Sequence, residues 1–465
     1  MLSNIKLGQM EIPKEDPFAN DRLGRKEPAN VLTGLVSKVP GPLVVSLNGG
    51  WGTGKTVFLK MWQQSLENER FRAIYFSAWE DDYSNDALVA MIGQIWVTLE
   101  RTSYKEIAAS IKECAVPLLK KTVVGTIKAV TAGSVSLDEK ELQSAGKQAV
   151  DEYIAAGRMI KDLKDRLNGL ASKVREETEK PLVIIVDELD RCRPTFAIEL
   201  LEKIKHLFDI PGILFVLGID REQLGHSIRA VYGQGMNVDG YLRRFIDMEF
   251  ILSPGGTRPF CLHMFEQLGL NKSCNENVSR GVDSNRMCDI ISRLWGCFAL
   301  SLRDIEHCCR LLALAYTDTG GISPLPSYLL ATLILVKLVN PDLYREYCQG
   351  RCNGGNVSDF IAAQPGAADF FNTNEGMRVQ VELLMCSPDE WRDAVLEQMR
   401  LQLNEAFTKP ELVPETVKNM SKDALSWVCE WCERSTDRWY GRDVLVDVSK
   451  KLELASLMLG DGRRF

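Results

Sequence analysis

The first half of the chain alternates short apolar runs with longer segments in which apolar residues recur at helical spacing. The runs have strand length and are rich in β-branched or aromatic residues: Pro42–Leu47, Arg72–Ser77, Leu182–Val186, Ile213–Leu217 and Met248–Leu252. Three of them have almost no polar interruption, which is typical of strands buried on both faces of a parallel sheet. The segments between them are long enough for helical crossovers. The sequence therefore predicts an α/β domain with a parallel sheet over residues 1–255.

From about Leu262 the pattern becomes helical. Apolar residues follow one another at spacings of three and four, as in the series Leu302, Ile305, Cys309, Leu312 and Tyr316. Ser327–Val339 and Asp389–Leu403 have a similar pattern. We therefore predict a helical lid over residues 256–340 and a helical C-terminal region over residues 341–465.

A long segment, about residues 102–180, separates the second predicted strand from the third. Its second half carries an apolar stripe formed by Tyr153, Ala156, Ile160, Leu163, Leu167, Leu170 and Val174. Two interpretations stay open: a coiled-coil-like helix that projects and contacts a partner, or an amphipathic helix that lies on its own domain. The first half, Ala115–Leu137, is apolar but is interrupted by Pro117 and by lysines. We expect no membrane span, because a span needs about 20 nearly uncharged residues.

Composition and charge narrow the class of protein. Lys and Arg number 56 and Asp and Glu number 63, which gives a net charge of −7. This balance does not favour binding to nucleic acid or anionic membranes, although a local basic groove stays open. The 13 cysteines are irregularly spaced, and Met1–Asp16 is polar and does not resemble a secretory signal. We therefore expect reduced thiols and a cytoplasmic location.

Residues 49–56 form a phosphate-binding motif. The sequence Gly49-Gly50-Trp51-Gly52-Thr53-Gly54-Lys55-Thr56 matches G-x-x-x-x-G-K-[ST] and lies between a predicted strand and a predicted helix. The glycines let consecutive backbone N–H groups point at phosphate oxygens, and the helix adds its positive N-terminal end. We expect Lys55 on the β- and γ-phosphates and the hydroxyl of Thr56 on Mg²⁺.

A pair of carboxylates ends the third predicted strand. In Pro181–Asp190 the apolar run stops at Asp187 and Glu188, at the sheet edge where the phosphate loop should also lie. We assign Asp187 to the Mg²⁺ side of the site and Glu188 to the general base that activates water. Asp190, and in an alternative interpretation also Glu188, caps the next helix. Arg191 is predicted to form a salt bridge at the start of that helix.

Further motifs occur in a fixed order along the chain. They are Asp16-Pro17 with Asn20-Asp21-Arg22-Leu23-Gly24-Arg25, the tryptophan-containing phosphate loop, Phe76-Ser77-Ala78-Trp79 followed by Glu80-Asp81-Asp82, Asp187-Glu188-Leu189-Asp190-Arg191-Cys192, Tyr241-Leu242-Arg243-Arg244-Phe245-Ile246, and Leu302-Arg303-Asp304-Ile305. Together they cover about residues 16–316, and they resemble the motifs of the KAP-type P-loop NTPases, a STAND-like branch of prokaryotic nucleotide switches. The resemblance implies a P-loop core with a helical lid and roles in conflict systems such as the exclusion of phage.

Two departures from the family pattern affect these expectations. The family more often has Asp where this chain has Glu188, but a glutamate also activates water. Many relatives carry paired membrane helices where this chain has residues 102–180. Because lysines interrupt the apolar half of that segment, the resemblance does not extend to membrane anchoring.

Arginines are needed to stabilise the charge on the transferred phosphoryl group. The resemblance places Arg303 in the lid as a sensor arginine, and Arg243 or Arg244 would act as a finger in a second subunit. A surface charge is the alternative for all three. Trp51 is predicted to pack on a neighbouring element and to fix the shape of the loop, and Trp79 to be buried at the end of its strand.

These observations predict an ATP-binding and ATP-hydrolysing switch with protein partners or self-association. The alternatives are a nucleotide-gated scaffold with little turnover and a small-molecule kinase. The carboxylate pair favours hydrolysis over binding alone, and the helical half is larger than a kinase needs. No N-K-x-D motif is found in the expected place, which favours ATP over GTP. A C-terminal cluster is interpreted as helix core, partner surface or base-stacking surface: Trp427, Trp431, Arg434, Arg438, Trp439, Tyr440 and Arg442.

Overall fold

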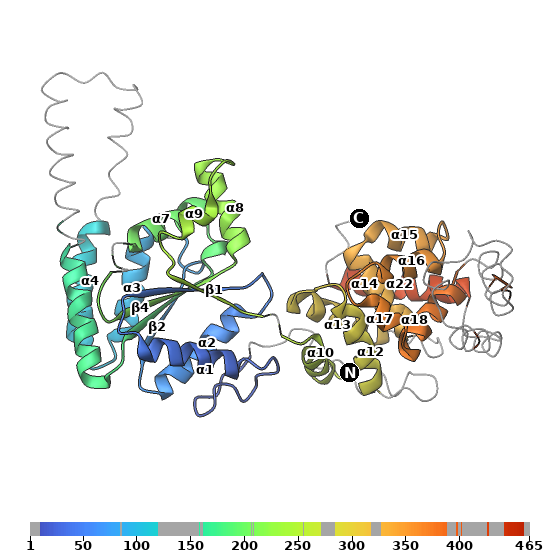
Figure 1. The fold of residues 1–465 in the computed structure, drawn as a ribbon, viewed down its shortest axis with the longest axis horizontal. Coiled ribbons are helices and arrows are strands. Elements are labelled where there is room, and N and C mark those ends of the chain that lie inside the picture. The colour runs from blue at the N-terminus through green and yellow to red at the C-terminus, as the bar shows by residue number, and fades with distance from the viewer. Residues whose placement is uncertain are drawn as a thin grey trace, which may run out of the picture. The chain divides into compact units, whose positions relative to one another are not determined.

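A computed structural model of the chain describes residues 10–83, 86–119, 158, 161–205, 207, 209–253, 255–270, 284–317, 327–387, 397, 398, 401, 426 and 441–459. The chain divides into two compact units (Figure 1): Met10–Pro254, the sheet unit, and the residues from Gly255 to Phe465, the helical unit. The predicted division of the helical half at residue 340 stays a prediction. Apart from Arg442, the C-terminal aromatic and basic cluster lies outside the described residues.

Among the described residues, five parallel strands form a sheet in the order β2-β3-β4-β1-β5. Their bounds are β1 (Leu43–Asn48), β2 (Arg72–Ser77), β3 (Leu182–Asp187), β4 (Ile213–Ile219) and β5 (Met248–Ile251). Every residue of β3 and β4 is buried, as their uninterrupted apolar runs predict for central strands. The predicted fold class, α/β with a parallel sheet and a helical second half, is confirmed.

Helices cover both faces of the sheet (Figure 1). They are α1 (Lys26–Lys38), α2 (Lys55–Asn68), α3 (Ala87–Leu99), α4 (Lys105–Leu119), α7 (Pro194–Ile204), α8 (Arg221–Tyr232) and α9 (Val238–Leu242). On one face, Phe58 and Trp62 of α2 share a core with Val183 of β3. On the other face, Ile184 shares a core with Ile92 of α3. Successive strand residues therefore enter opposite cores, as the period-two geometry of a strand requires.

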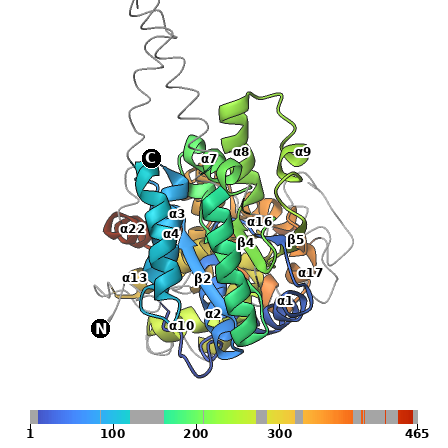
Figure 2. The ribbon, with the colours of Figure 1, turned by 90° about the vertical axis from the view of Figure 1, so that its left-hand side faces the viewer.

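The described parts of the segment at residues 102–180 pack on the sheet unit itself. The buried residues there belong to the same core as α3: Tyr104, Ala108, Ile111, Leu163, Leu167, Leu170, Ala171 and Val174. Figure 2 faces this side of the unit, where α3 and α4 pack against each other. For residues 161–178 the projecting coiled coil is therefore wrong, and the amphipathic helix on its own domain is correct. Tyr153, Ala156 and Ile160 lie outside the described residues.

The helical unit contains α10 (Thr257–Gln267), α12 (Ser284–Gly296), α13 (Leu302–Thr317), α14 (Ser327–Val339), α15 (Pro341–Gln349), α16 (Gly354–Ala362), α17 (Ala367–Phe371), α18 (Asn374–Met385) and α22 (Arg442–Met458). α14 contacts α12, α13, α15, α18 and α22, and Leu329–Val336 are all buried. A helix that is apolar on every side needs such a surrounding layer. Within the described ranges, no helix combines the length and the apolar character that crossing a membrane requires.

Candidate functional site

The loop of residues 49–54 joins the end of β1 to the start of α2. Gly52 and Gly54 have φ values of 79° and 85°, in the left-handed region that favours glycine. Gly54 is the N-cap residue of α2 and has no side chain, so the first backbone N–H groups of the helix are left for a ligand. The amide of Gly49 donates to the carbonyl of Ile219 at 3.1 Å, which ties the start of the loop to β4.

Lys55 lies at the first position of α2 and is only 8% exposed. Its ammonium group donates to the loop carbonyls of Gly49 and Gly50. Burial lowers the pKa of Lys55, while the charges of Asp190, Asp220 and Asp187 oppose this shift. The ammonium group is therefore surrounded by loop carbonyls and acidic side chains.

Asp187 ends β3 and is completely buried. Its carboxylate accepts hydrogen bonds from the hydroxyl of Tyr75 at 2.8 Å and from the backbone N–H of Glu188 at 2.8 Å. The side chain of Thr56 is close enough to lower the pKa of Asp187. Burial raises its pKa, and these hydrogen bonds partly offset that effect. Its neighbour on β4 is Gly218, where an added Cβ would lie 2.4 Å from Asp187 Oδ1. Only glycine leaves room for the carboxylate at that register position.

Glu188 follows Asp187 with φ of 63° and is 9% exposed. The hydroxyl of Ser77, at the end of β2, donates to its Oε2 at 2.9 Å. Its Oε1 forms an ion pair with Arg191, whose guanidinium lies 5.6 Å from the ring centre of Trp79. The predicted salt bridge of Arg191 is thus present. Both oxygens of the candidate base are engaged by protein groups.

Two further carboxylates hold Trp51, in the middle of the loop. Asp220, directly after β4, accepts the backbone N–H of Trp51 at 3.0 Å. Asp190, in the 3₁₀ turn η1 (Leu189–Arg191), accepts the indole N–H of the same residue. Asp190 therefore does not cap α7, whose N-cap residue is Arg193 and has no side-chain capping bond.

The prediction for Trp51 is partly correct, and the prediction for Trp79 is wrong. Trp51 contacts a neighbouring turn as expected, but through a hydrogen bond, and its side chain stays 46% exposed. Trp79 is 52% exposed, so its predicted burial is wrong. The chain turns outward directly after β2, and the ring lies near the guanidinium of Arg191 at the surface.

Arg25 also supports the phosphate loop, through hydrogen bonds to backbone carbonyls. Its side chain is 3% exposed, and its guanidinium donates to the carbonyl of Thr53 at 2.8 Å and to the carbonyl of Ser253. Burial lowers its pKa. Ser253 follows β5, so one arginine joins the phosphate loop to the chain that leaves the sheet.

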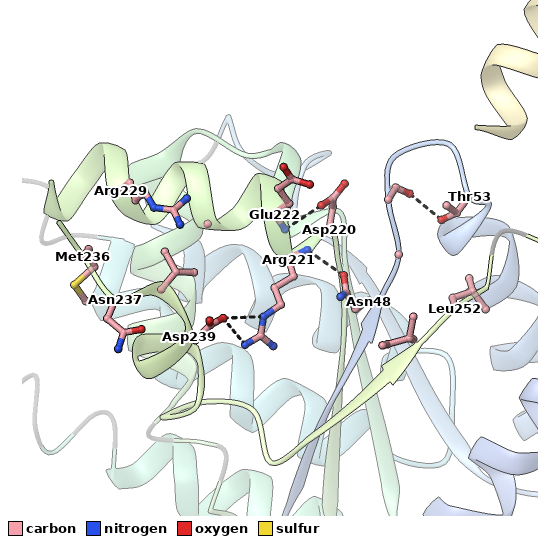
Figure 3. A pocket seen from close by; sticks show the side chains of 15 residues that line it. Asn48, Thr53, Asp220, Arg221, Glu222, Arg229, Met236, Asn237, Asp239 and Leu252 are labelled. Carbon is pink, nitrogen blue, oxygen red and sulfur yellow. Dashed lines mark hydrogen bonds and ion pairs between the residues drawn. The ribbon is translucent and has the colours of Figure 1, made fainter. Parts of the chain in front are cut away.

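A cavity of about 790 Å³ opens beside the loop. Figure 3 shows its walls, which are the loop, the N-terminal end of α8, the turn into α9 and the end of β5. Gly49, Gly50 and Thr53 belong to the lining, so one side of the loop faces open space. Cavities of about 300–1,000 Å³ are the usual size for small-molecule and cofactor sites.

Of the three predicted arginines, the two in the sheet unit lie away from the loop. Arg243 and Arg244 follow α9, are exposed, and lead into the amino end of β5, whereas the loop follows the carboxyl end of β1. Arg303 is exposed on α13 of the helical unit. Their roles as fingers and sensor stay predictions.

Thr56 and Asp187 fit a magnesium ion. A hydroxyl and a carboxylate that lie near each other supply hard oxygen ligands, and Mg²⁺ is usually held by one or two carboxylates together with phosphates and water. Across the described ranges, no group of three or more His, Cys, Asp or Glu side chains is placed to hold a metal ion. Phosphate oxygens and water would therefore complete the shell.

Sequence reasoning missed several residues of the site. Asp220 had a usable signal, because it directly follows the apolar run of β4 and so lies at the same sheet edge as Asp187. Tyr75 had none, and Ser77 was part of a motif, but the contacts of both depend on the register of β2 against β3. Arg25 was part of a motif, but nothing in its spacing indicates a contact with residue 53.

Comparison with known proteins gives a family match and more distant relatives. The model described as "KAP family P-loop domain" matches residues 25–316. An uncharacterized protein of Methanocaldococcus jannaschii is 28% identical over 174 residues, covering 32% of this chain and 89% of that protein. The phage T7 exclusion protein of Escherichia coli K12 is 21% identical over 370 residues, covering 68% of this chain. The match spans 46% of the exclusion protein, about half its length.

Two solved structures show weak similarity over most of the chain. Cdc6p from Pyrobaculum aerophilum aligns with a TM-score of 0.33 and 13% identity, covering 96% of this chain and 97% of that one. The ORC2 protein of Aeropyrum pernix, in ADPNP and ADP complexes, aligns with a TM-score of 0.35 and 12% identity, covering 92% and 95%.

Proposed function

Because the chain belongs to the KAP family of P-loop proteins, we propose that it binds ATP with Mg²⁺ at residues 49–56 and hydrolyses the nucleotide. The observation that carries this proposal is the carboxylate pair at the end of β3, Asp187 and Glu188, which lies near Lys55 and Thr56 of the phosphate motif. A metal-side carboxylate and a second carboxylate beside a phosphate loop are the groups that water attack on a γ-phosphate needs.

Each residue then has a defined task. The loop amides and Lys55 bind the phosphates, Thr56 and Asp187 hold Mg²⁺, and Glu188 accepts the proton of the attacking water. Bound Mg²⁺ would offset the negative charge that the phosphates and the carboxylates bring together. Arg303 from the lid, or Arg243 or Arg244 from a second subunit, would supply positive charge to the transferred phosphoryl group.

We also propose that the protein acts as a switch with slow basal turnover. Ser77 engages one oxygen of Glu188 and Arg191 the other, so these contacts compete with the attacking water for the lone pairs of the carboxylate. Closure of the lid or contact with a second subunit would weaken that competition. A nucleotide-gated scaffold with little turnover is the second candidate, and the same contacts favour it.

The biological role that we propose is defence against phage in the bacterial cytoplasm. It is supported by the relation to the phage T7 exclusion protein. Plating efficiency of phage T7 on cells with the parent chain and with Lys55→Ala tests this part. Equal plating on both strains would rule out a nucleotide-dependent role in exclusion of that phage.

Phosphate release from the purified chain tests the enzymatic part. We expect release with Mg²⁺ and ATP, loss of release with EDTA, and a higher rate when a protein partner is added. Tight binding of ATP without measurable release, under all these conditions, would favour the scaffold.

A further inference from the structure

Asp190 has no task in the hydrolysis proposed above, yet its carboxylate lies at the phosphate loop. It is 5% exposed, and its Oδ2 accepts the indole N–H of Trp51. Its Oδ1 is buried and has no hydrogen-bond partner among the described residues. Because burial of a carboxylate is costly, a carboxylate that makes one hydrogen bond in such a place needs an explanation.

Trp51 is held at two points that come from different strands. Asp220, after β4, accepts its backbone N–H at 3.0 Å, and Asp190, after β3, accepts its indole N–H. The side chain is 46% exposed, so burial of the ring does not explain its position. The two hydrogen bonds to carboxylates are the contacts that fix this residue within a run of glycines.

We propose that Asp190 is a positioning residue of the phosphate loop and that it acts through the indole of Trp51. The proposal rests on the proposed function, in which this loop binds the phosphates of a nucleotide. A loop with glycines at positions 49, 50, 52 and 54 has many accessible conformations. Holding Trp51 restricts the loop before the ligand arrives, so less conformational entropy is lost on binding.

A second mechanism is possible on electrostatic grounds, and it makes different predictions. Among the charges that oppose the lowered pKa of Lys55, that of Asp190 ranks first. If this charge were the main role of Asp190, removing it would matter even when the indole contact is kept. Asp190→Asn separates the two mechanisms, because the amide oxygen can still accept the indole N–H but carries no charge.

Hydrogen exchange of residues 49–54 in the nucleotide-free chain is the primary test. We expect Asp190→Ala and Trp51→Phe each to raise exchange of the loop amides by about tenfold, the size of one lost hydrogen bond. The double variant should exchange no faster than either single variant, because both remove the same contact. Asp190→Asn should stay within about twofold of the parent chain.

Trp79→Phe is the matched control. Trp79 is also half-exposed and near the site, but its indole makes no hydrogen bond among the described residues, and phenylalanine keeps a ring near Arg191. Loop exchange should not change in this variant. Unchanged exchange in Trp51→Phe, or exchange in Asp190→Asn as fast as in Asp190→Ala, would overturn the proposal. These two variants remove little volume, so the test stands even if Asp190→Ala folds poorly.

Titration with an ATP analogue and Mg²⁺ then links the loop to the ligand. We expect Asp190→Ala and Trp51→Phe to weaken binding by about tenfold and Asp190→Asn by less than threefold. If the parent chain binds no nucleotide but loop exchange responds as described, the proposed function fails and the positioning role stands. If the parent binds and loop exchange does not respond, only the positioning role fails.

Discussion

The ends of β3 and β4 are neighbours in the sheet, yet the carboxylates that follow them have different partners. Asp187 accepts a side-chain hydrogen bond from Tyr75 and lies near Thr56, at the place where we propose Mg²⁺. Asp220 accepts the backbone N–H groups of Glu222 and Gln223 with one oxygen and that of Trp51 with the other. Asp187 therefore lies near Thr56 of the phosphate motif, and Asp220 supports the loop.

The distance from strand to helix explains this difference. α8 begins at Arg221, immediately after Asp220, so the free N–H groups of its first turn engage the carboxylate as an N-cap. After β3, the 3₁₀ turn η1 separates Asp187 and Glu188 from α7. Asp220 is therefore engaged as the cap of α8, whereas Asp187 caps no helix.

Lys55 is the cation that both strand ends face, so its loss should have the largest effect. We expect Lys55→Ala to weaken binding of an ATP analogue with Mg²⁺ by more than about 100-fold, because it removes the main positive side chain at the β- and γ-phosphates. Isothermal titration measures this. Lys38→Ala, at the exposed end of α1, is the control. Affinity within threefold of the parent chain would contradict the assignment of the loop.

The end of β3 should separate binding from turnover. Glu188→Gln should keep nucleotide affinity and lower the rate of hydrolysis by about 10²–10⁴-fold, the usual contribution of a general base. Asp187→Asn should weaken binding as well, because it impairs the Mg²⁺ side of the site. Single-turnover hydrolysis and equilibrium binding of both variants check this. A near-parental rate in Glu188→Gln would leave Glu188 as an ion-pair partner of Arg191 alone.

Substitution of Asp220, at the end of β4, should mainly lower the stability of the folded protein. Asp220→Ala removes the N-cap of α8, which costs about 0.5–2 kcal/mol, and frees the amide of Trp51. We expect a lower denaturation midpoint and nucleotide binding weakened by about tenfold or less. Asp220→Asn is the matched control, because asparagine is an equally good cap and can still accept one N–H. If Asp220→Asn lost hydrolysis but kept nucleotide binding, the carboxylate of Asp220 would also take part in the reaction.

Ser77→Ala should give the smallest change. It frees Oε2 of Glu188 from a hydroxyl at 2.9 Å and leaves the ion pair with Arg191 in place. We expect basal hydrolysis to rise by a few fold, as the loss of one hydrogen bond allows, without a change in nucleotide affinity. Steady-state phosphate release at saturating ATP measures this. A fall in rate would indicate that Ser77 holds Glu188 in its productive position.

Much of the fold could be predicted because β3 and β4 are buried on both faces. Such strands need uninterrupted apolar runs, and these are visible in the sequence. The phosphate loop and the carboxylate pair were visible for a similar reason, since each is a local pattern at the end of such a run. The stripe at Leu163, Leu167 and Leu170 was ambiguous, because an apolar face does not show whether it covers a partner or its own sheet.

The rest of the site depends on contacts between distant segments. Ser77 meets Glu188 only because β2 pairs with β3 in one register, which places Ser77 opposite Asp187. Asp190 was predicted as a helix cap from its position, but the loop supplies an indole N–H that the local sequence does not reveal. Local patterns identified the groups for the proposed chemistry, whereas the residues that hold those groups required the tertiary structure.

The hydrogen bonds from Arg25 to Thr53 and Ser253 have a consequence for folding during synthesis. Arg25 lies 28 positions before Thr53 and 228 positions before Ser253, and it joins all three segments. During synthesis on the ribosome, residues 49–56 emerge long before Ser253 does. The phosphate loop therefore gains its complete support only after β5 has been synthesised. A nascent chain that ends before this strand should bind nucleotide weakly, and competence for nucleotide should arise late in the synthesis of the sheet unit.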